Sequence, residues 1–252
     1  NRAVFGRLDT ALSERSSLKL GLRWERWEAD YADRFTAFIY GDPSMPVSNA
    51  FAPSENLWGG DISLDRQFGE ASRAYLLVSR GYKAGGFNPS VARALGPGAE
   101  LGPEAITFRP ETLLNVEAGF KGSWLDGRLA ADAALFWMDR DDMQLRSSAQ
   151  FTANPNDFVF ITSNAEGHAT GLEASVSWQL TDDWRVHGSL GLLDSEVDAY
   201  GLEREQDIEG EIVGRDFAHA PSWTASAGIT YLDATGWFGR LDLNAADDFY
   251  FD

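Results

Sequence analysis

The chain has 252 residues, 44% of them apolar, and a formal net charge of −18 at pH 7. This excess of acidic groups excludes nucleic acid as a partner, because the phosphates would be repelled. The sequence also contains no run of about 18 apolar residues, which excludes a membrane-spanning helix.

Apolar and polar residues alternate with a period of two along most of the chain. This pattern predicts strands, because successive side chains of a strand point to opposite faces of a sheet. The clearest example runs from Gly171 to Leu192 and is interrupted by a short turn at 181–183. In chain order, the alternation predicts about ten strands, at residues 4–12, 17–34, 57–67, 73–87, 109–125, 128–145, 159–180, 184–198, 221–232 and 237–251.

The connections between these strands are alternately short and long. The short turns lie at 13–16, 68–70, 125–128, 181–183 and 233–236, and the long connections at 35–56, 84–108, 146–158 and 199–219. Short turns at one end and long loops at the other are typical of outer-membrane barrels. The predicted fold is therefore all-β, an antiparallel transmembrane β-barrel of which the chain supplies about ten strands.

Tryptophan follows the same pattern. Eight of the nine tryptophans have the apolar parity of their strands, and only Trp27 does not. Trp124, Trp178, Trp184 and Trp237 adjoin short turns, whereas Trp24, Trp58, Trp137 and Trp223 lie farther along their strands. Two aromatic belts, one for each membrane interface, would explain this arrangement. The alternative is a soluble β-sandwich, in which the tryptophans would be buried in a shared core.

Much of the acidic charge falls in one long connection, from Tyr200 to Asp216. It is interpreted either as a solvated loop, or as a segment that binds lipopolysaccharide through divalent cations or contacts a cationic ligand. Strand-like sequence at both ends of the chain predicts that it is a piece of a longer protein. Its terminal strands would then pair with each other or with strands outside the chain, because unpaired strand edges are not tolerated in lipid.

The segment from Val78 to Asn88, with sequence VSRGYKAGGFN, resembles the barrel signature of TonB-dependent outer-membrane receptors. The resemblance is strongest to the ferric-siderophore branch that includes the pesticin and yersiniabactin receptor. Further motifs match in order up to about residue 250: Pro110-Glu111-Thr112 with Asn115, Glu117, Gly119 and Lys121; Leu135-Phe136 with Met138-Asp139, Asp142 and Gln144; Asn164-Ala165; Gly171-Leu172-Glu173; and Ala220-Pro221.

The resemblance implies that residues 1–252 form a barrel segment without the plug domain that fills the lumen in this family. It implies a bacterial outer-membrane protein that contacts lipid and lipopolysaccharide. It also implies uptake of a scarce nutrient, a ferric siderophore above all, driven by the TonB complex through the missing plug. No cofactor and no enzymatic activity are expected. A passive porin-like channel and, less favoured, an outer-membrane enzyme are the alternatives.

Two groups of residues are candidates for function. The first group has the inward parity and would contact the plug or pair across the wall: Glu117, Lys121, Glu173, Arg185, Arg240 and Asp242. The second group lies at the predicted mouth and would contact an anionic ligand or anchor the wall at the interface: Arg80, Tyr82, Lys83, Arg93 and Arg215.

Histidine gives no metal-ligand spacing, because His168, His187 and His219 are far apart in the sequence and the chain has no cysteine. No metal site is therefore predicted. His187 and Ser189 share a strand face, as a lipase-like site would require, but their parity is inward. No catalytic residue is predicted.

Overall fold

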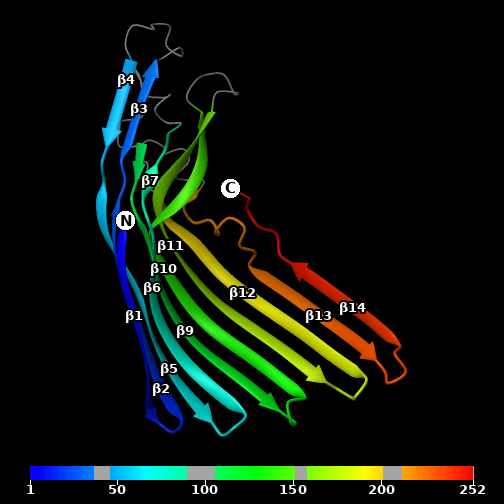
Figure 1. Ribbon diagram of the computed structural model, residues 1–252. Coiled ribbons are helices and arrows are strands. Elements are labelled where there is room, and N and C mark those ends of the chain that lie inside the picture. The colour runs from blue at the N-terminus through cyan, green and yellow to red at the C-terminus, as the bar shows by residue number, and fades with distance from the viewer. Residues whose placement is uncertain (37–45, 90–105, 151–157, 201–211, 252) are drawn as a thin grey trace.

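The computed structural model describes residues 1–36, 46–89, 106–150, 158–200 and 212–251. Ten strands form one antiparallel sheet in which spatial order follows chain order, as Figure 1 shows. The strands are β1 (Arg2–Ser13), β2 (Ser16–Glu28), β5 (Ser54–Phe68), β6 (Ser72–Lys83), β9 (Glu111–Trp124), β10 (Leu129–Gln150), β11 (Phe158–Gln179), β12 (Trp184–Tyr200), β13 (Trp223–Leu232) and β14 (Phe238–Ala246). The ten predicted strands are thus confirmed.

Four shorter strands lie beyond the ends of these ten. β3 (Tyr31–Thr36) pairs with β4 (Pro46–Phe51), and β7 (Gly86–Phe87) pairs with β8 (Thr107–Phe108). The strand predicted at 17–34 is therefore confirmed as β2 only up to Glu28, where the chain leaves the sheet and continues as β3. Pro53 on the partner segment has no N–H to continue the ladder, although its carbonyl accepts a hydrogen bond from Ala29 at 3.2 Å.

Two other strands end earlier than predicted, whereas the strand predicted at 128–145 continues to Gln150. The strand predicted at 73–87 ends at Lys83, and its last residues belong to β7 instead. The strand predicted at 237–251 ends at Ala246, and the segment after it turns back so that the Tyr250 carbonyl accepts a hydrogen bond from His219. In both cases aromatic residues recur past the point at which the partner strand stops, namely Phe87 and the segment Phe249 to Phe251, so alternation alone overextends the strand.

The register separates an apolar face from a polar face. On the apolar face, one row of directly paired residues runs across five strands: Leu20, Ile62, Val78, Val116 and Trp137. Large side chains on this face are uncovered by the described residues, since Leu22 is 62% exposed and Leu135 is 59% exposed. An uncovered apolar surface of this extent marks a binding or membrane surface. The soluble-sandwich alternative is therefore wrong.

The tryptophans confirm the predicted parity. Seven of the eight on the apolar face are more than a third exposed, and Trp124 is half-buried where it stacks on Phe120, with ring centroids 6.0 Å apart. Trp124 and Trp178 both face Leu129 at the end of the sheet with short turns, here called the turn end. Trp24 and Trp58 pair with each other toward the opposite end, here called the loop end. The two groups form belts at two heights.

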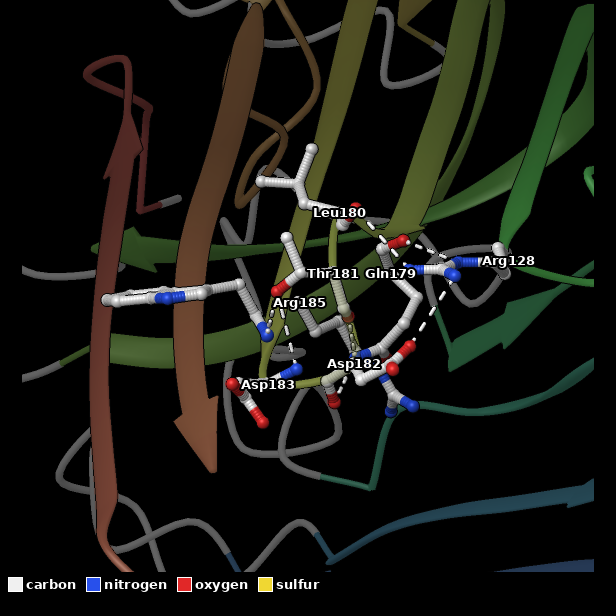
Figure 2. Close-up of polar contacts among 8 residues, drawn as sticks. Arg128, Gln179, Leu180, Thr181, Asp182, Asp183 and Arg185 are labelled. Carbon is white, nitrogen blue, oxygen red and sulfur yellow. Dashed lines mark hydrogen bonds and ion pairs between the residues drawn. The ribbon is translucent and has the colours of Figure 1, made fainter. Parts of the chain in front are cut away.

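Local hydrogen bonds close the short turns. Figure 2 shows Arg128, from the turn between β9 and β10, donating to the carbonyl of Gln179, the last residue of β11; the donor and acceptor atoms are 3.2 Å apart. The Thr181 hydroxyl accepts hydrogen bonds from the backbone N–H groups of Asp183 and Trp184. In the last turn, hydrogen bonds to the Asp233 carboxylate, first from the Thr235 hydroxyl, lower its pKa.

Among the described residues, a small buried core lies at the loop end. It consists of Met143, Ala165, Val197 and Tyr200, with Ile212 and Phe217 packed against it. β1 and β14 form the two edges of the sheet, and neither pairs with the other among the described residues. No helix in the described part of the chain is long and apolar enough to cross a membrane.

Candidate functional site

The polar face carries all six residues that the sequence placed toward the lumen. Lys121 is in one row with Asp132 and Ser175, and Glu173 is two residues along β11 from Ser175. Arg185 is opposite Thr230, which in turn pairs with Arg240. Alternation along the strands is sufficient for this grouping, because register fixes which side chains share a face. The polar face is the first part of the candidate site.

Four of these six residues are engaged within the wall. The Arg240 guanidinium donates to both oxygens of Asp242, at 2.6 and 3.0 Å, and the His187 Nε2 lies 3.1 Å from the same carboxylate. Arg185 donates to the Gln179 side chain at 2.9 Å, and Glu117 accepts a hydrogen bond from the Tyr75 hydroxyl.

Lys121 and Glu173 differ from the other four. Neither makes a hydrogen bond or ion pair to any residue in the described ranges, and both are exposed. Lys121 lines a hollow of about 470 Å³ on the polar face together with Asp132, Ser189 and Ser226. The charges of Lys121 and Glu173 are therefore available to bind a group outside the described residues.

The loop end brings Tyr82 from β6 to two charged residues of β2. The Tyr82 hydroxyl donates to Glu25 at 2.8 Å and accepts from Arg23 Nε at 2.9 Å, while Arg23 also donates to Glu25 at 2.7 Å. Arg7, Asp61 and Leu113 line the same open hollow, whose volume is about 770 Å³. Tyr82 is a candidate from the sequence, whereas Arg23 and Glu25 are not, because only the register of the strands places them beside Tyr82.

The other predicted mouth residues do not gather at one point. Arg80 has the apolar parity, and its guanidinium lies 4.1 Å from the centre of the Trp58 ring and donates to the Trp58 carbonyl. Lys83 is exposed at the end of β6, opposite Glu111. The Arg215 guanidinium lies 5.0 Å from the centre of the Tyr250 ring. Arg93 lies outside the described residues.

Three motif residues of the sequence meet in a network at the loop end. The buried Glu111 carboxylate accepts from Arg140 Nε at 2.9 Å and from the backbone N–H of Gln144 at 3.0 Å. The Gln144 side chain donates to the Ala84 carbonyl at 2.8 Å. The Asn164 side chain donates to the Asp142 carbonyl at 2.8 Å. These residues tie together β9, β10, β11 and the end of β6, so their role here is architectural.

His187 and Ser189 form no catalytic pair. His187 contacts Asp242, whereas the Ser189 hydroxyl lies 2.7 Å from that of Ser226. Within the described ranges, His168 is the one histidine that lies beside two carboxylates, those of Glu196 and Asp198.

The comparisons with known proteins agree on one family. The family model described as "TonB dependent receptor-like, beta-barrel" matches residues 1–252. The chain is 25% identical over 198 residues to a probable TonB-dependent receptor, BfrD, of Bordetella pertussis, covering 77% of this chain and 24% of that protein. It is 25% identical over 161 residues to the metal-pseudopaline receptor CntO of Pseudomonas aeruginosa, covering 64% of this chain and 21% of that protein.

Solved structures share the fold. The ferric yersiniabactin uptake receptor FyuA of Yersinia pestis superposes with a TM-score of 0.74 at 22% identity, over 99% of this chain and 34% of that one. The siderophore receptor PiuA of Acinetobacter baumannii superposes with a TM-score of 0.71 at 19% identity, over 98% of this chain and 33% of that one. The chain spans about a quarter of the length of the curated relatives that it matches.

Proposed function

The chain belongs to the family of TonB-dependent receptor β-barrels, and from this membership we propose that it forms part of the wall of a receptor for the energised uptake of ferric siderophores. Members of this family are outer-membrane transporters of Gram-negative bacteria and not enzymes. One observation carries the proposal beyond the family match: the sheet has an uncovered apolar face between two tryptophan belts and a charged polar face behind it. Such a wall separates lipid from a water-filled or plugged lumen.

The substrate class is inferred from the relatives. Their names describe a ferric yersiniabactin uptake receptor, a siderophore receptor and a metal-pseudopaline receptor, all of which handle metal chelates. An anionic chelate requires cationic and hydrogen-bonding groups where it enters. We propose that Tyr82, Lys83, Arg93 and Arg215 supply these groups, and that Arg80 contributes less because its guanidinium packs on the Trp58 ring.

Contact with a plug is assigned to particular wall residues. Lys121 and Glu173 lie on the polar face without a partner among the described residues, so of the six candidates they are the ones best placed to bind a domain inside the lumen. Arg240, Asp242, Arg185 and Glu117 are engaged within the wall, so they would contribute to a plug contact only by exchanging partners. We therefore propose both expected roles, contact with the plug for Lys121 and Glu173 and pairing within the wall for the other four residues.

Uptake by the intact receptor tests the proposal. Radiolabelled ferric siderophore should accumulate in cells that express the intact protein, and collapse of the inner-membrane proton gradient should abolish accumulation while surface binding continues. The matched control is a strain that expresses the receptor without the energy-coupling complex. Uptake that continues unchanged after the gradient is collapsed would show a passive pore instead. Binding without uptake in energised cells would show that the siderophore used is not the substrate.

A further inference from the structure

A histidine and two carboxylates converge on the outside of the wall at the loop end. His168 lies on β11, and Glu196 and Asp198 lie on β12. All three have the apolar parity, but they lie beyond the last apolar pair on these strands, Leu172 with Leu192. The next pairs are Thr170 with Asp194 and then His168 with Glu196. Beyond the lipid-facing rows the same face therefore becomes acidic.

A β-bulge brings the third group into place. Gly167 pairs with Val197 and Glu166 pairs with Ala199, so Asp198 is an extra residue with no partner on β11. Bulges re-aim side chains, and this one allows Asp198 to approach the histidine that already faces Glu196. The His168 Nδ1 lies 2.9 Å from each Asp198 carboxylate oxygen, and one ligand atom from each of the three side chains lies within 4.8 Å of the others.

We propose that His168, Glu196 and Asp198 form a binding site for a divalent transition-metal ion such as Zn²⁺. Imidazole nitrogen and carboxylate oxygen both bind Zn²⁺ at about 2.0–2.2 Å, so an ion placed among the three groups needs only side-chain rotations to be coordinated. Three protein ligands leave a coordination position open, and the partial exposure of all three side chains turns that position toward solvent.

Negative charge around the cluster also favours binding of a cation, apart from the geometry of the three ligands. Asp194 on β12 and Asp139, which pairs with His168 from β10, add two carboxylates on the same face. This acidic surface lies next to the tryptophan belt at the loop end, since Trp137 of that belt pairs with Thr170, two residues from His168. Anionic lipid headgroups at that level would be repelled by the acidic surface, and a bound divalent cation offsets that repulsion.

Zinc titration calorimetry on the intact receptor in detergent tests the site. At pH 8, where an ordinary imidazole is neutral, His168→Ala and Asp198→Asn should each lose one Zn²⁺ site or weaken it by about tenfold or more. Asp182→Asn removes a carboxylate that is 97% exposed at the turn end, and it should bind Zn²⁺ as the unmodified receptor does. Ca²⁺ should bind at least about tenfold more weakly than Zn²⁺, because hard cations prefer oxygen to imidazole.

Equal Zn²⁺ stoichiometry and affinity in the unmodified receptor, His168→Ala and Asp198→Asn would overturn the proposal. Loss of Zn²⁺ binding in Asp182→Asn as well as in these two variants would also overturn it, because the effect would then be general to surface charge. Protease resistance of the barrel checks that each variant is folded. If His168→Ala does not fold, His168→Gln replaces it, since glutamine keeps a hydrogen bond to Asp198 but supplies no imidazole.

Discussion

Leu190 and Ser189 are neighbours on β12 that face opposite sides of the wall. Replacing each in turn by arginine tests which face contacts lipid and which contacts water. Leu190 is 41% exposed on the apolar face, whereas the Ser189 hydroxyl contacts that of Ser226 on the polar face. Both positions have the same depth in the membrane. The difference between Leu190→Arg and Ser189→Arg therefore measures the environment of each face.

The magnitude follows from the position of Leu190 on its strand. Leu190 is six residues from Trp184 of the turn-end belt. At about 3.4 Å per residue and a tilt of about 40°, this places it about 16 Å above that belt, near the middle of an apolar band about 25 Å tall. Arginine on the lipid face at this depth costs about 2 to 4 kcal/mol. Ser189→Arg loses one hydrogen bond, worth about 1 kcal/mol. The expected difference is therefore about 1 to 3 kcal/mol.

Denaturant unfolding of the intact receptor in lipid vesicles gives both free energies. We expect a lower midpoint for Leu190→Arg than for Ser189→Arg, with equal slopes, because the surface exposed on unfolding is the same. Val176→Arg, level with Gly188 and so two residue pairs closer to the turn end than Leu190, lies about 10 Å above the same belt by this geometry and should cost about as much as Leu190→Arg. Equal losses for Leu190→Arg and Ser189→Arg, or a larger loss for Ser189→Arg, would refute the assignment of the two faces.

Three further predictions concern single contacts. Glu111→Gln should destabilise the intact receptor by about 1.5 to 3 kcal/mol in the same unfolding assay, because a buried charged hydrogen-bond partner of Arg140 is lost; exposed Glu166→Gln is the control, and equal effects would contradict the network. Gly119→Ala should cost about 1 to 3 kcal/mol, because a Cβ there would lie 2.2 Å from the Tyr75 ring, and a cost that is the same in a Tyr75→Ala background would contradict this contact. Burial and then a hydrogen bond to Asp33 raise the pKa of Tyr31 to about 12. The resulting stabilisation is present below pH 10 and is lost as pH rises through 12, so a tyrosinate titration in which Tyr31→Phe removes no group titrating near 12 would contradict it.

The arrangement of the strands and faces could be predicted because it follows from a local property. Period-two alternation fixes which side chains share a face, and short turns fix antiparallel neighbours. Leu172 to Trp178 on β11 and the eight tryptophans therefore lie where the sequence places them. The resemblance of residues 78–88 to the receptor family is confirmed by the family match over the whole chain.

The remaining features depend on pairing between strands. The break after Glu28 involves Pro53, which lies between β4 and β5 and faces the end of β2 only once these strands are paired. The approach of Asp198 to His168 requires a bulge, which the sequence of β12 alone does not predict. Glu111, Gln144 and Asn164 were found as motif residues, but their shared network appears only when β9, β10 and β11 are in register. Arg23 and Glu25 were missed as partners of Tyr82 for the same reason.

The central claim is that one face of this sheet meets lipid and the other meets water, and site-directed spin labelling tests it most directly. The chain has no cysteine, so labels can be attached at Val176→Cys on the apolar face and Ser177→Cys on the polar face of the same strand. In the intact receptor, with any other cysteine replaced, the label at 176 should be relaxed mainly by oxygen, which concentrates in lipid. The label at 177 should be relaxed mainly by a water-soluble nickel complex. The reverse pattern, or water accessibility at both positions, would contradict the account.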